Sequence, residues 1–244
     1  MKICFYNVDV AYVDFLKKYE TATRGFTRVP NIQYKSGNNK FFYGTVLNIN
    51  GIDYFVPISS KQHNRQDDIP IKTKDKYKKE LSTLRFAYML PIPKKCLSYL
   101  DINQETNNTR KETLRKELAF CMRNRDKIQR QAKTTYDRIT NHININLSHN
   151  SCDFKLLEDA YIIYCHDNDL PLSEELQKRY AEITGEQPTE KTAIANHTSV
   201  QESKKPQGFT FSVAQLKENA KRVHEQAEKK PTPTKINNKD KGSL

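Results

Sequence analysis

Long apolar runs are missing from this chain of 244 residues. No stretch comes near the roughly 20 apolar residues needed to cross a bilayer, and the N-terminus has neither the apolar segment nor the cleavage site of a signal peptide. The sequence therefore predicts a cytosolic protein with no membrane partner. Its length allows one medium domain with an appendage, or two small domains.

Metal-ligating patterns are also missing. No Cys-x-x-Cys pair occurs, which argues against a zinc knuckle or a disulfide framework and predicts buried thiols at Cys4, Cys96, Cys121, Cys152 and Cys165. The histidines lack ligand spacing, and His142 and His149 fall in an Asn-rich stretch that favours a solvated loop. We therefore expect neither a metal nor a cofactor.

Acidic residues are in the minority, with 29 Asp and Glu against 41 Lys and Arg, a net charge of +12. The excess is concentrated: residues 1–100 carry +9, residues 101–166 carry +2 and residues 167–244 carry +1. A basic surface of this kind favours a polyanionic partner over a small neutral substrate. The distribution places that surface on the first half of the chain, not on a basic tail.

The strongest local pattern is a β-hairpin over residues 40–61. Two β-branched and aromatic runs flank Asn50-Gly51, the dipeptide that best tolerates the positive φ angles of a tight turn. Pairing would fold Lys40 back towards Ser59, Ser60 and Lys61 at the other end. Hydroxyl and ammonium groups that converge at a strand end suit phosphate chemistry, although an ordinary polar exit from a strand has the same composition.

The remaining periodicity indicates an α+β protein. The loop 20–39 is basic with an interleaved tyrosine, which suits RNA because phosphates bind the cations and a base can stack on the ring. The other expected elements, in chain order, are a strand over 1–7, a helix over 9–19, an exposed loop over 61–80, a strand over 84–92, one long helix over 109–140, an Asn-rich loop over 141–150 and a helix from Phe154.

Charged residues cover the outer face of the helix expected over 109–140. Lys116 and Arg123 are among its cations, and nearby Glu and Asp balance them in part. A salt-bridged surface helix and an RNA-facing helix fit this pattern equally well.

Composition changes after residue 166. Ser173 can cap a helix through Tyr180, residues 185–208 are typical of a disordered linker, and Ser212-x-x-Gln215 is a capping box that opens a helix to about residue 228. We therefore divide the chain into a domain over 1–166 and an extension over 167–244. The extension would either bind a partner or be a solvated tail.

Several short segments resemble the ToxN/AbiQ family of endoribonuclease toxins from type III toxin–antitoxin systems. None is a strong motif alone, but they occur in the same order and at the same separations over about residues 1–166. The segments are 42–51, 54–60, 89–92, 98–101, 116–120, 126–128 and 152–158.

The resemblance implies a compact, strongly bent antiparallel β-sheet core of the MazF/Kid type, an SH3-like barrel, decorated with helices. It also implies a metal-independent, sequence-selective RNase that cuts messenger RNA in phage defence or plasmid maintenance. The same site would cut a repetitive antitoxin transcript into pseudoknots, which stay bound as inhibitors in closed rings of protein and RNA.

The resemblance also assigns site residues. Lys40 matches the family lysine before the first hairpin strand, Ser59 and Ser60 match its hydroxyl pair, and Tyr34 matches its loop tyrosine. Two departures occur: the spacing from Tyr34 to Lys40 is longer, and the family's Ser-Pro-Lys is replaced by Ser60-Lys61-Gln62. Lys61 is then a shifted equivalent of that lysine, or His63 replaces it.

These residue types suit RNA cleavage to a 2′,3′-cyclic phosphate. Lys40 and Lys61 would stabilise the phosphorane, Ser59 and Ser60 would position the phosphate, and Tyr34 would stack on a base or bind the phosphate. The general base stays open between a desolvated Lys40 and His63. The residues expected to bind RNA outside the reacting centre are Arg28, Lys35, His63, Arg65, Lys116 and Arg123.

Two other functions compete with the nuclease. An RNA-binding module without catalysis would result if the shift at Lys61 marks a decayed site. A DNA-binding plasmid-maintenance factor would act through the tail helix, but that segment is nearly neutral.

Overall fold

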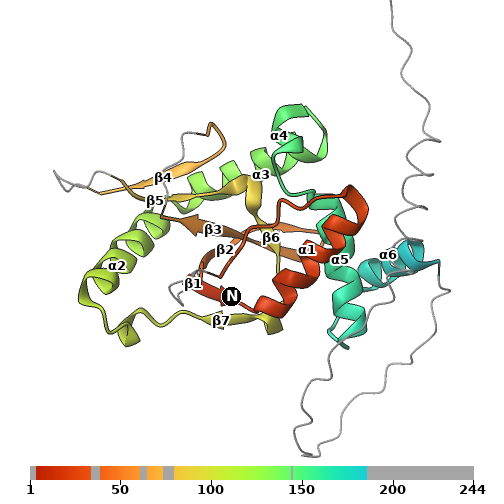
Figure 1. The fold of residues 1–244 in the computed structure, drawn as a ribbon, viewed down its shortest axis with the longest axis horizontal. Helices are drawn as coiled ribbons and strands as arrows, with labels where there is room; N and C mark the ends of the chain where they lie inside the picture. Colours follow the sequence, from red (N-terminus) through yellow and green to blue (C-terminus); the bar gives the residue numbers. More distant parts are fainter. Residues whose placement is uncertain (1–3, 34–38, 61–64, 74–79, 144, 186–244) are drawn as a thin grey trace, which may run out of the picture. The chain divides into compact units, whose positions relative to one another are not determined.

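An antiparallel sheet of seven strands is the centre of the computed structural model, which describes residues 4–33, 39–60, 65–73, 80–143 and 145–185 (Figure 1). The order is β4-β5-β3-β2-β1-β7, and β6 pairs with β3 outside this path. The strands are β1 (Cys4–Val8), β2 (Phe42–Ile49), β3 (Ile52–Ser59), β4 (Ile69–Lys72), β5 (Glu80–Leu84), β6 (Leu90–Pro91) and β7 (Leu97–Tyr99).

The predicted hairpin is confirmed as the pair β2 and β3. Asn50 and Gly51 form its turn with φ angles of 50° and 85°, the left-handed conformation that this dipeptide tolerates. The register shifts between Gly44 and Leu47, where β2 bulges. Gly44 leaves room for the ring of Phe55, whose Cδ1 would lie 2.0 Å from a Cβ at this position.

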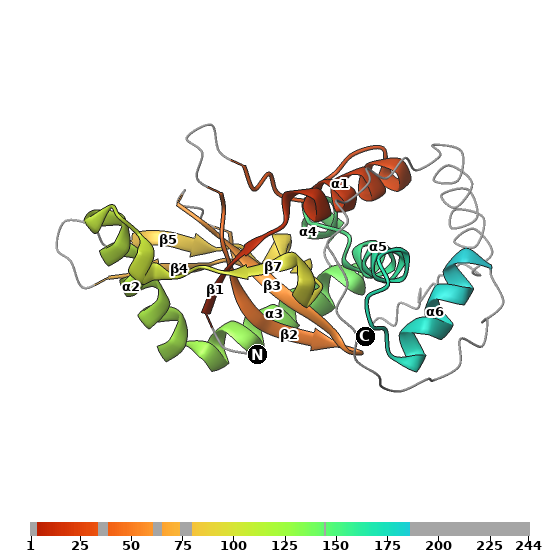
Figure 2. The ribbon, with the colours of Figure 1, turned by 90° about the horizontal axis from the view of Figure 1, so that it is seen from below.

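The described part of the chain has six α-helices: α1 (Val10–Arg24), α2 (Asn108–Arg123), α3 (Arg125–Thr140), α4 (Ile145–His149), α5 (Phe154–Asp167) and α6 (Glu174–Thr184). Of these, α6 packs mainly on α5 and α4 mainly on α3. Figure 2 shows α1 on one side of the sheet and α3 on the other. Short 3-10 turns occur at Phe86–Tyr88, Lys94–Cys96 and Ile102–Gln104. None of the described helices is long and apolar enough to cross a membrane.

Aromatic rings join the hairpin to the helices. Tyr54 of β3 is fully buried, and its ring centroid lies 5.8 Å from that of Tyr136 in α3 and 5.7 Å from that of Phe154 in α5. The Tyr54 hydroxyl donates to the buried carboxylate of Glu158 at 3.0 Å, so the ring's polar end is satisfied. The predicted burial of the thiols is confirmed, because all five cysteines are buried and none forms a disulfide.

The expectation of a closed SH3-like barrel was wrong. Along the described strands the sheet is open, because β4 and β7 are its two edges and do not pair with each other. The helix expected over 9–19 continues to Arg24, since Tyr19 and Glu20 are buried as well. It ends at Gly25, whose φ of 77° places it in the left-handed region favoured at a helix C-terminus.

Four further expectations were wrong in part. The loop over 61–80 contains β4, an edge strand of four residues whose Ile69 and Ile71 are buried and whose Pro70 obscured the pattern. The run 84–92, expected as one strand, splits into the end of β5, a 3-10 turn and β6, because the backbone N–H groups of Tyr88 and Met89 donate within the turn to the carbonyls of Arg85 and Phe86. The long helix over 109–140 breaks at Asn124, and the loop 141–150 contains α4.

The last two described helices agree with the sequence. α5 begins near Phe154 as predicted, and Ser173 caps α6 by accepting a hydrogen bond from the backbone N–H of Leu176 at 3.4 Å. The predicted helix over 212–228 and the linker beyond residue 185 lie outside the described residues. The domain boundary at residue 166 stays a prediction.

Candidate active site

The two hairpin strands end side by side, away from their turn. Their register continues beyond β2, because the backbone N–H of Ile58 donates to the carbonyl of Phe41 at 3.1 Å. One residue further, the same register sets Lys40 beside Ser59. Lys40 is held from its other side as well, since its backbone N–H donates to the carbonyl of Ile32 at 2.7 Å. The ladder thus brings the predicted lysine to the first predicted hydroxyl.

β5 continues this row of polar residues. Ser59 pairs with Thr83, whose hydroxyl donates to the Glu80 carboxylate at 3.1 Å. Residues directly opposite each other share a face of the sheet, so Lys40, Ser59 and Thr83 lie in one row. Ser59 is buried, with 8% of its surface exposed, whereas Ser60 at the strand end is exposed. Ser60 is therefore the hydroxyl of the pair that solvent reaches.

Four predicted site residues lie outside the described residues: Tyr34, Lys35, Lys61 and His63. The described ends of their segments are nevertheless fixed. An isolated bridge pairs Gln33 with Asn39, so the chain that contains Tyr34 leaves and returns beside Lys40. The segment with Lys61 starts directly after Ser60.

Arg28 and Arg65, both predicted to bind RNA, are brought to adjacent carbonyls at the end of α4. Arg28 Nε donates to the His149 carbonyl at 3.2 Å, and Arg65 Nη1 donates to the Asn150 carbonyl at 3.4 Å. The Arg28 guanidinium also lies 5.2 Å from the centroid of the Phe26 ring. Two segments far apart in sequence therefore place fixed positive charges in one region.

Tyr88 connects Arg65 to the sheet. Its hydroxyl accepts a hydrogen bond from Arg65 Nη1 at 3.2 Å, and the Arg85 guanidinium lies 4.7 Å from its ring centroid. The backbone N–H of Arg85 donates to the carbonyl of Pro57 at 3.1 Å, which fixes Arg85 next to the end of β3. Its Nε lies 2.8 Å from Oδ2 of Asp68.

Asp68 changes the charge of this region near neutral pH. Burial raises the pKa of its carboxyl to about 7, the adjacent Asp67 adds to the increase, and Arg85 and Arg65 oppose it. The side chain is fully buried, so it acts through Arg85 and not on a ligand. As pH rises through 7, the pair of Arg85 and Asp68 changes from a net positive charge to neutrality.

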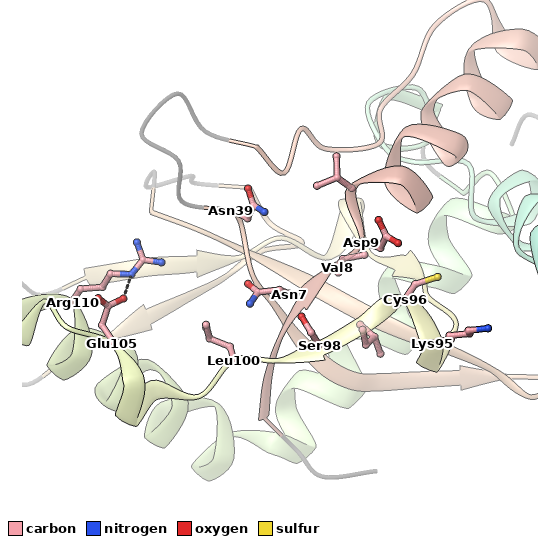
Figure 3. Close-up of a pocket in the computed structure, with 12 residues that line it drawn as sticks. Asn7, Val8, Asp9, Asn39, Lys95, Cys96, Ser98, Leu100, Glu105 and Arg110 are labelled. Carbon is pink, nitrogen blue, oxygen red and sulfur yellow. Dashed lines mark ion pairs between the residues drawn. The ribbon is translucent and has the colours of Figure 1, made fainter. Parts of the chain in front are cut away.

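A groove of about 610 Å³ begins next to Lys40 (Figure 3). Asn39, the residue before Lys40, borders it, and Asn7 and Ser98 from the paired strands β1 and β7 lie at its centre. Lys95 lies at one end, and at the other Arg110 forms an ion pair with Glu105 at 2.8 Å. Asp9 and Glu105 also line the groove, so its two cations are balanced by two carboxylates. Its amide and hydroxyl groups can bind the base edges of a single strand.

Two predicted RNA-binding residues, Lys116 and Arg123, lie elsewhere on the surface. Both are exposed on α2, the helix that also carries Arg110 of the groove. At about 100° per residue, their side chains point roughly 120–140° away from that of Arg110 around the helix axis, so they face away from the groove. Their contact with RNA stays a prediction. A smaller hollow of about 310 Å³, lined by Lys94 and Arg125 among others, lies near the hairpin turn and contains none of the predicted site residues.

Sequence reasoning missed the groove and the partners of the predicted residues. Thr83 was outside the strand predicted from residue 84, and only strand pairing shows that it faces Ser59. Asn7 and Ser98 are ordinary polar residues in sequence, and the pairing of β1 with β7 brings them together. The only sequence signal that could have pointed to an RNA-binding surface here was the excess of basic residues among the first 100.

Comparison with known proteins identifies the family. A family model described as "Toxin ToxN, type III toxin-antitoxin system" matches residues 4–162. The chain belongs to the ToxN family. The predicted resemblance is thereby confirmed. A curated ToxN relative, the Endoribonuclease ToxN of Pectobacterium atrosepticum, is 28% identical over 165 residues, which are 64% of this chain and 91% of that protein. Members of this family are thus RNA-cutting enzymes, as the sequence predicted.

Solved structures of ToxN-like toxins have the same fold. One, described as showing selective toxin inhibition by a non-coding RNA pseudoknot, is 24% identical with a TM-score of 0.57 and covers 68% of this chain and 96% of its own. Another, described as a bacterial antiviral system regulated by a processed non-coding RNA, is 26% identical with a TM-score of 0.55 and covers 65% and 97%. The family model ends at residue 162, inside α5.

Proposed function

We propose that this ToxN family member is a metal-independent, sequence-selective endoribonuclease toxin that cuts single-stranded RNA. The observation that carries the proposal is the position of Lys40, beside Ser59 in the strand ladder and next to a groove with amide and hydroxyl groups and with charges of both signs. The endoribonuclease name of a relative that shares most of its length with this chain supports the reaction class.

The reaction we propose is attack by the ribose 2′-hydroxyl on the adjacent phosphorus. The 2′-oxygen loses its proton, the bond from the 2′-oxygen to phosphorus forms, and the bond from phosphorus to the 5′-oxygen breaks as that oxygen gains a proton. Lys40 stabilises the charge that develops on the phosphorane, which is the work a metal ion would otherwise do. Ser60 and Ser59 position the phosphate, and Lys61, Tyr34 and His63 complete the site.

The RNA strand would run from this centre in two directions. Asn39 and Asn7 in the groove offer donors and acceptors that can read bases, which supports sequence selectivity. Arg28 and Arg65, held at the end of α4, offer charge to phosphates on the other side. This path uses the positive charge that the sequence concentrates in its first 100 residues.

The partners follow from the toxin class. Messenger RNA is the proposed substrate, and the protein's own repetitive antitoxin transcript is cut at the same site into pseudoknots that inhibit it. The RNA pseudoknot and the processed RNA of the two solved relatives support this proposal. We place the activity in the cytoplasm, in phage defence or plasmid maintenance, with cyclic protein–RNA assembly as its inhibited form.

Substitution at the strand end tests the proposal. Lys40→Ala should lower the rate of RNA cleavage by roughly 10²- to 10³-fold, because it removes a charge aimed at the phosphorane. The matched control is Lys133→Ala, which removes an exposed lysine paired with Asp137 on α3 and should leave the rate unchanged. Equal rates for the two variants would exclude Lys40 from the site. RNA binding without any cleavage by the wild type would favour a binding module.

A further inference from the structure

The carboxylate of Glu20 lies at the centre of a hydrogen-bond network that serves no site described so far. Glu20 is in the last turn of α1 and is fully buried. Its Oε2 accepts hydrogen bonds from the Thr27 hydroxyl at 2.6 Å, the Arg28 backbone N–H at 2.6 Å and the Val29 backbone N–H at 3.2 Å. One oxygen thus fixes three consecutive residues of the segment that follows α1.

The second oxygen fixes this network to the body of the protein. Oε1 of Glu20 accepts from Arg24 Nη1 at 2.7 Å and from the backbone N–H of Asp153 at 3.0 Å. Asp153 caps α5, which packs against the central hairpin. Charge-assisted hydrogen bonds are the strong ones in a protein, so the segment after α1 is tied firmly to this core.

The tied segment leads directly to Lys40. Val29 and Ile32 are buried in the core, and the Ile32 carbonyl accepts the backbone N–H of Lys40 at 2.7 Å. The bridge from Gln33 to Asn39 adds a second link at the same place. Ile32, which holds the Lys40 backbone on the side away from the hairpin, therefore takes its position from residues 27–29, which Glu20 fixes.

We propose that Glu20 is a positioning residue that sets the place of Lys40 for RNA cleavage. This role rests on the proposed function, since it matters only if Lys40 acts on RNA. Glutamine cannot replace the carboxylate, because its NH₂ group would face two N–H donors in one orientation and three donors in the other. A misplacement of about 1 Å at a reacting centre can lower turnover by roughly 10²-fold.

The test compares Glu20→Gln with Glu158→Gln. Glu158 is also fully buried and accepts from the hydroxyls of Tyr54 and Tyr136 and from Arg179, but none of these contacts lies on the segment that leads to Lys40. The two variants therefore remove the same charge from equally buried places. Cleavage of a short RNA is measured at saturating concentration, with rates corrected for the folded fraction, together with amide hydrogen exchange over residues 27–33.

A positioning role predicts that Glu20→Gln lowers kcat at least about 10-fold, with a smaller change in KM, and increases hydrogen exchange over residues 27–33. Glu158→Gln should keep kcat within about 3-fold of the wild type. Equal kcat values for the two variants would overturn the role while leaving the nuclease intact. A wild-type protein that cuts no RNA would instead overturn the proposed function, and this role with it.

A milder variant decides the case if Glu20→Gln does not fold. Thr27→Val removes one donor from the network and leaves the buried carboxylate in place. We expect a fall in kcat of roughly 3- to 10-fold, again with increased exchange over 27–33. Turnover equal to that of the wild type would contradict the positioning role.

Discussion

Removing the guanidinium of Arg179 should destabilise the whole domain, although Arg179 lies beyond residues 4–162, which the family model matches. Its Nη1 lies 2.9 Å from Oε2 of the fully buried Glu158, and its Nη2 lies 2.6 Å from Oδ1 of Asp159. Arg179→Met keeps most of the side-chain volume. It removes the cation that lies nearest to the Glu158 carboxylate. Breaking a buried ion pair in this way costs about 3–5 kcal/mol of unfolding free energy.

The lower end of that range is the better expectation. The hydroxyls of Tyr54 and Tyr136 still donate to Glu158, and Lys155 still lies 3.3 Å from it, so part of its charge remains satisfied. We therefore expect a loss of about 3 kcal/mol, a large fraction of the roughly 5–15 kcal/mol typical of a domain.

Urea unfolding followed by circular dichroism measures this loss. The matched control is Lys178→Met, which removes an exposed cation from the neighbouring position on α6 and should cost less than about 0.5 kcal/mol. In the double variant with Glu158→Gln, the effects should be less than additive by at least about 1 kcal/mol. A cost for Arg179→Met equal to that of Lys178→Met would refute the reasoning, because the ion pair with Glu158 would then contribute nothing measurable to stability.

Three further outcomes are expected. Gly44→Ala should lower the unfolding free energy by at least about 2 kcal/mol, because its Cβ would meet the Phe55 ring, and Phe55→Leu in the same chain should recover part of the loss in thermal unfolding. Asp68 has a folded pKa of about 7, above the ordinary value of 3.8, so its contribution to stability is lost as pH rises between these values. Asp68→Asn should remove this slope, and urea unfolding at pH 5 and pH 8 should show a relative gain of about 2.5 kcal/mol at the higher pH, because about two pH units of the titration lie between them. Asn7→Ala in the groove should raise KM for RNA cleavage several-fold with kcat retained and alter the preferred cleavage sequence; unchanged kinetics would place the RNA elsewhere.

The hairpin and its polar end were predictable because their information is local. Asn50-Gly51 fixes the turn, and the turn's own register brings Lys40 back towards the end of β3, opposite Lys61. The bulge between Gly44 and Leu47, which the sequence did not predict, shifts the register by two residues and sets Lys40 beside Ser59. The short edge strand β4 was not predictable in this way, since a strand of four residues with a central proline carries almost no periodic signal. The break at Asn124 also went unseen, because the apolar pattern continues through it.

The supporting parts of the site required the tertiary structure. Glu20 reads in sequence as a charged residue near the end of a helix, and only its burial shows that it organises the segment leading to Lys40. The groove depends on the pairing of β1 with β7, whose residues lie about 90 positions apart. Arg28 and Arg65 meet because α4 presents two consecutive carbonyls to them, which no local pattern encodes.

The most direct test of the central claim is to map the ends of RNA cut by the purified protein. A long single-stranded RNA is incubated in excess chelator with the wild type, with Lys40→Ala and with Lys133→Ala. We predict that the wild type and Lys133→Ala cut at one short recurrent sequence and leave a 2′,3′-cyclic phosphate, while Lys40→Ala cuts roughly 10²- to 10³-fold more slowly. Cleavage abolished by the chelator, or an RNA that all three proteins bind and none cuts, would contradict a metal-independent nuclease centred on Lys40.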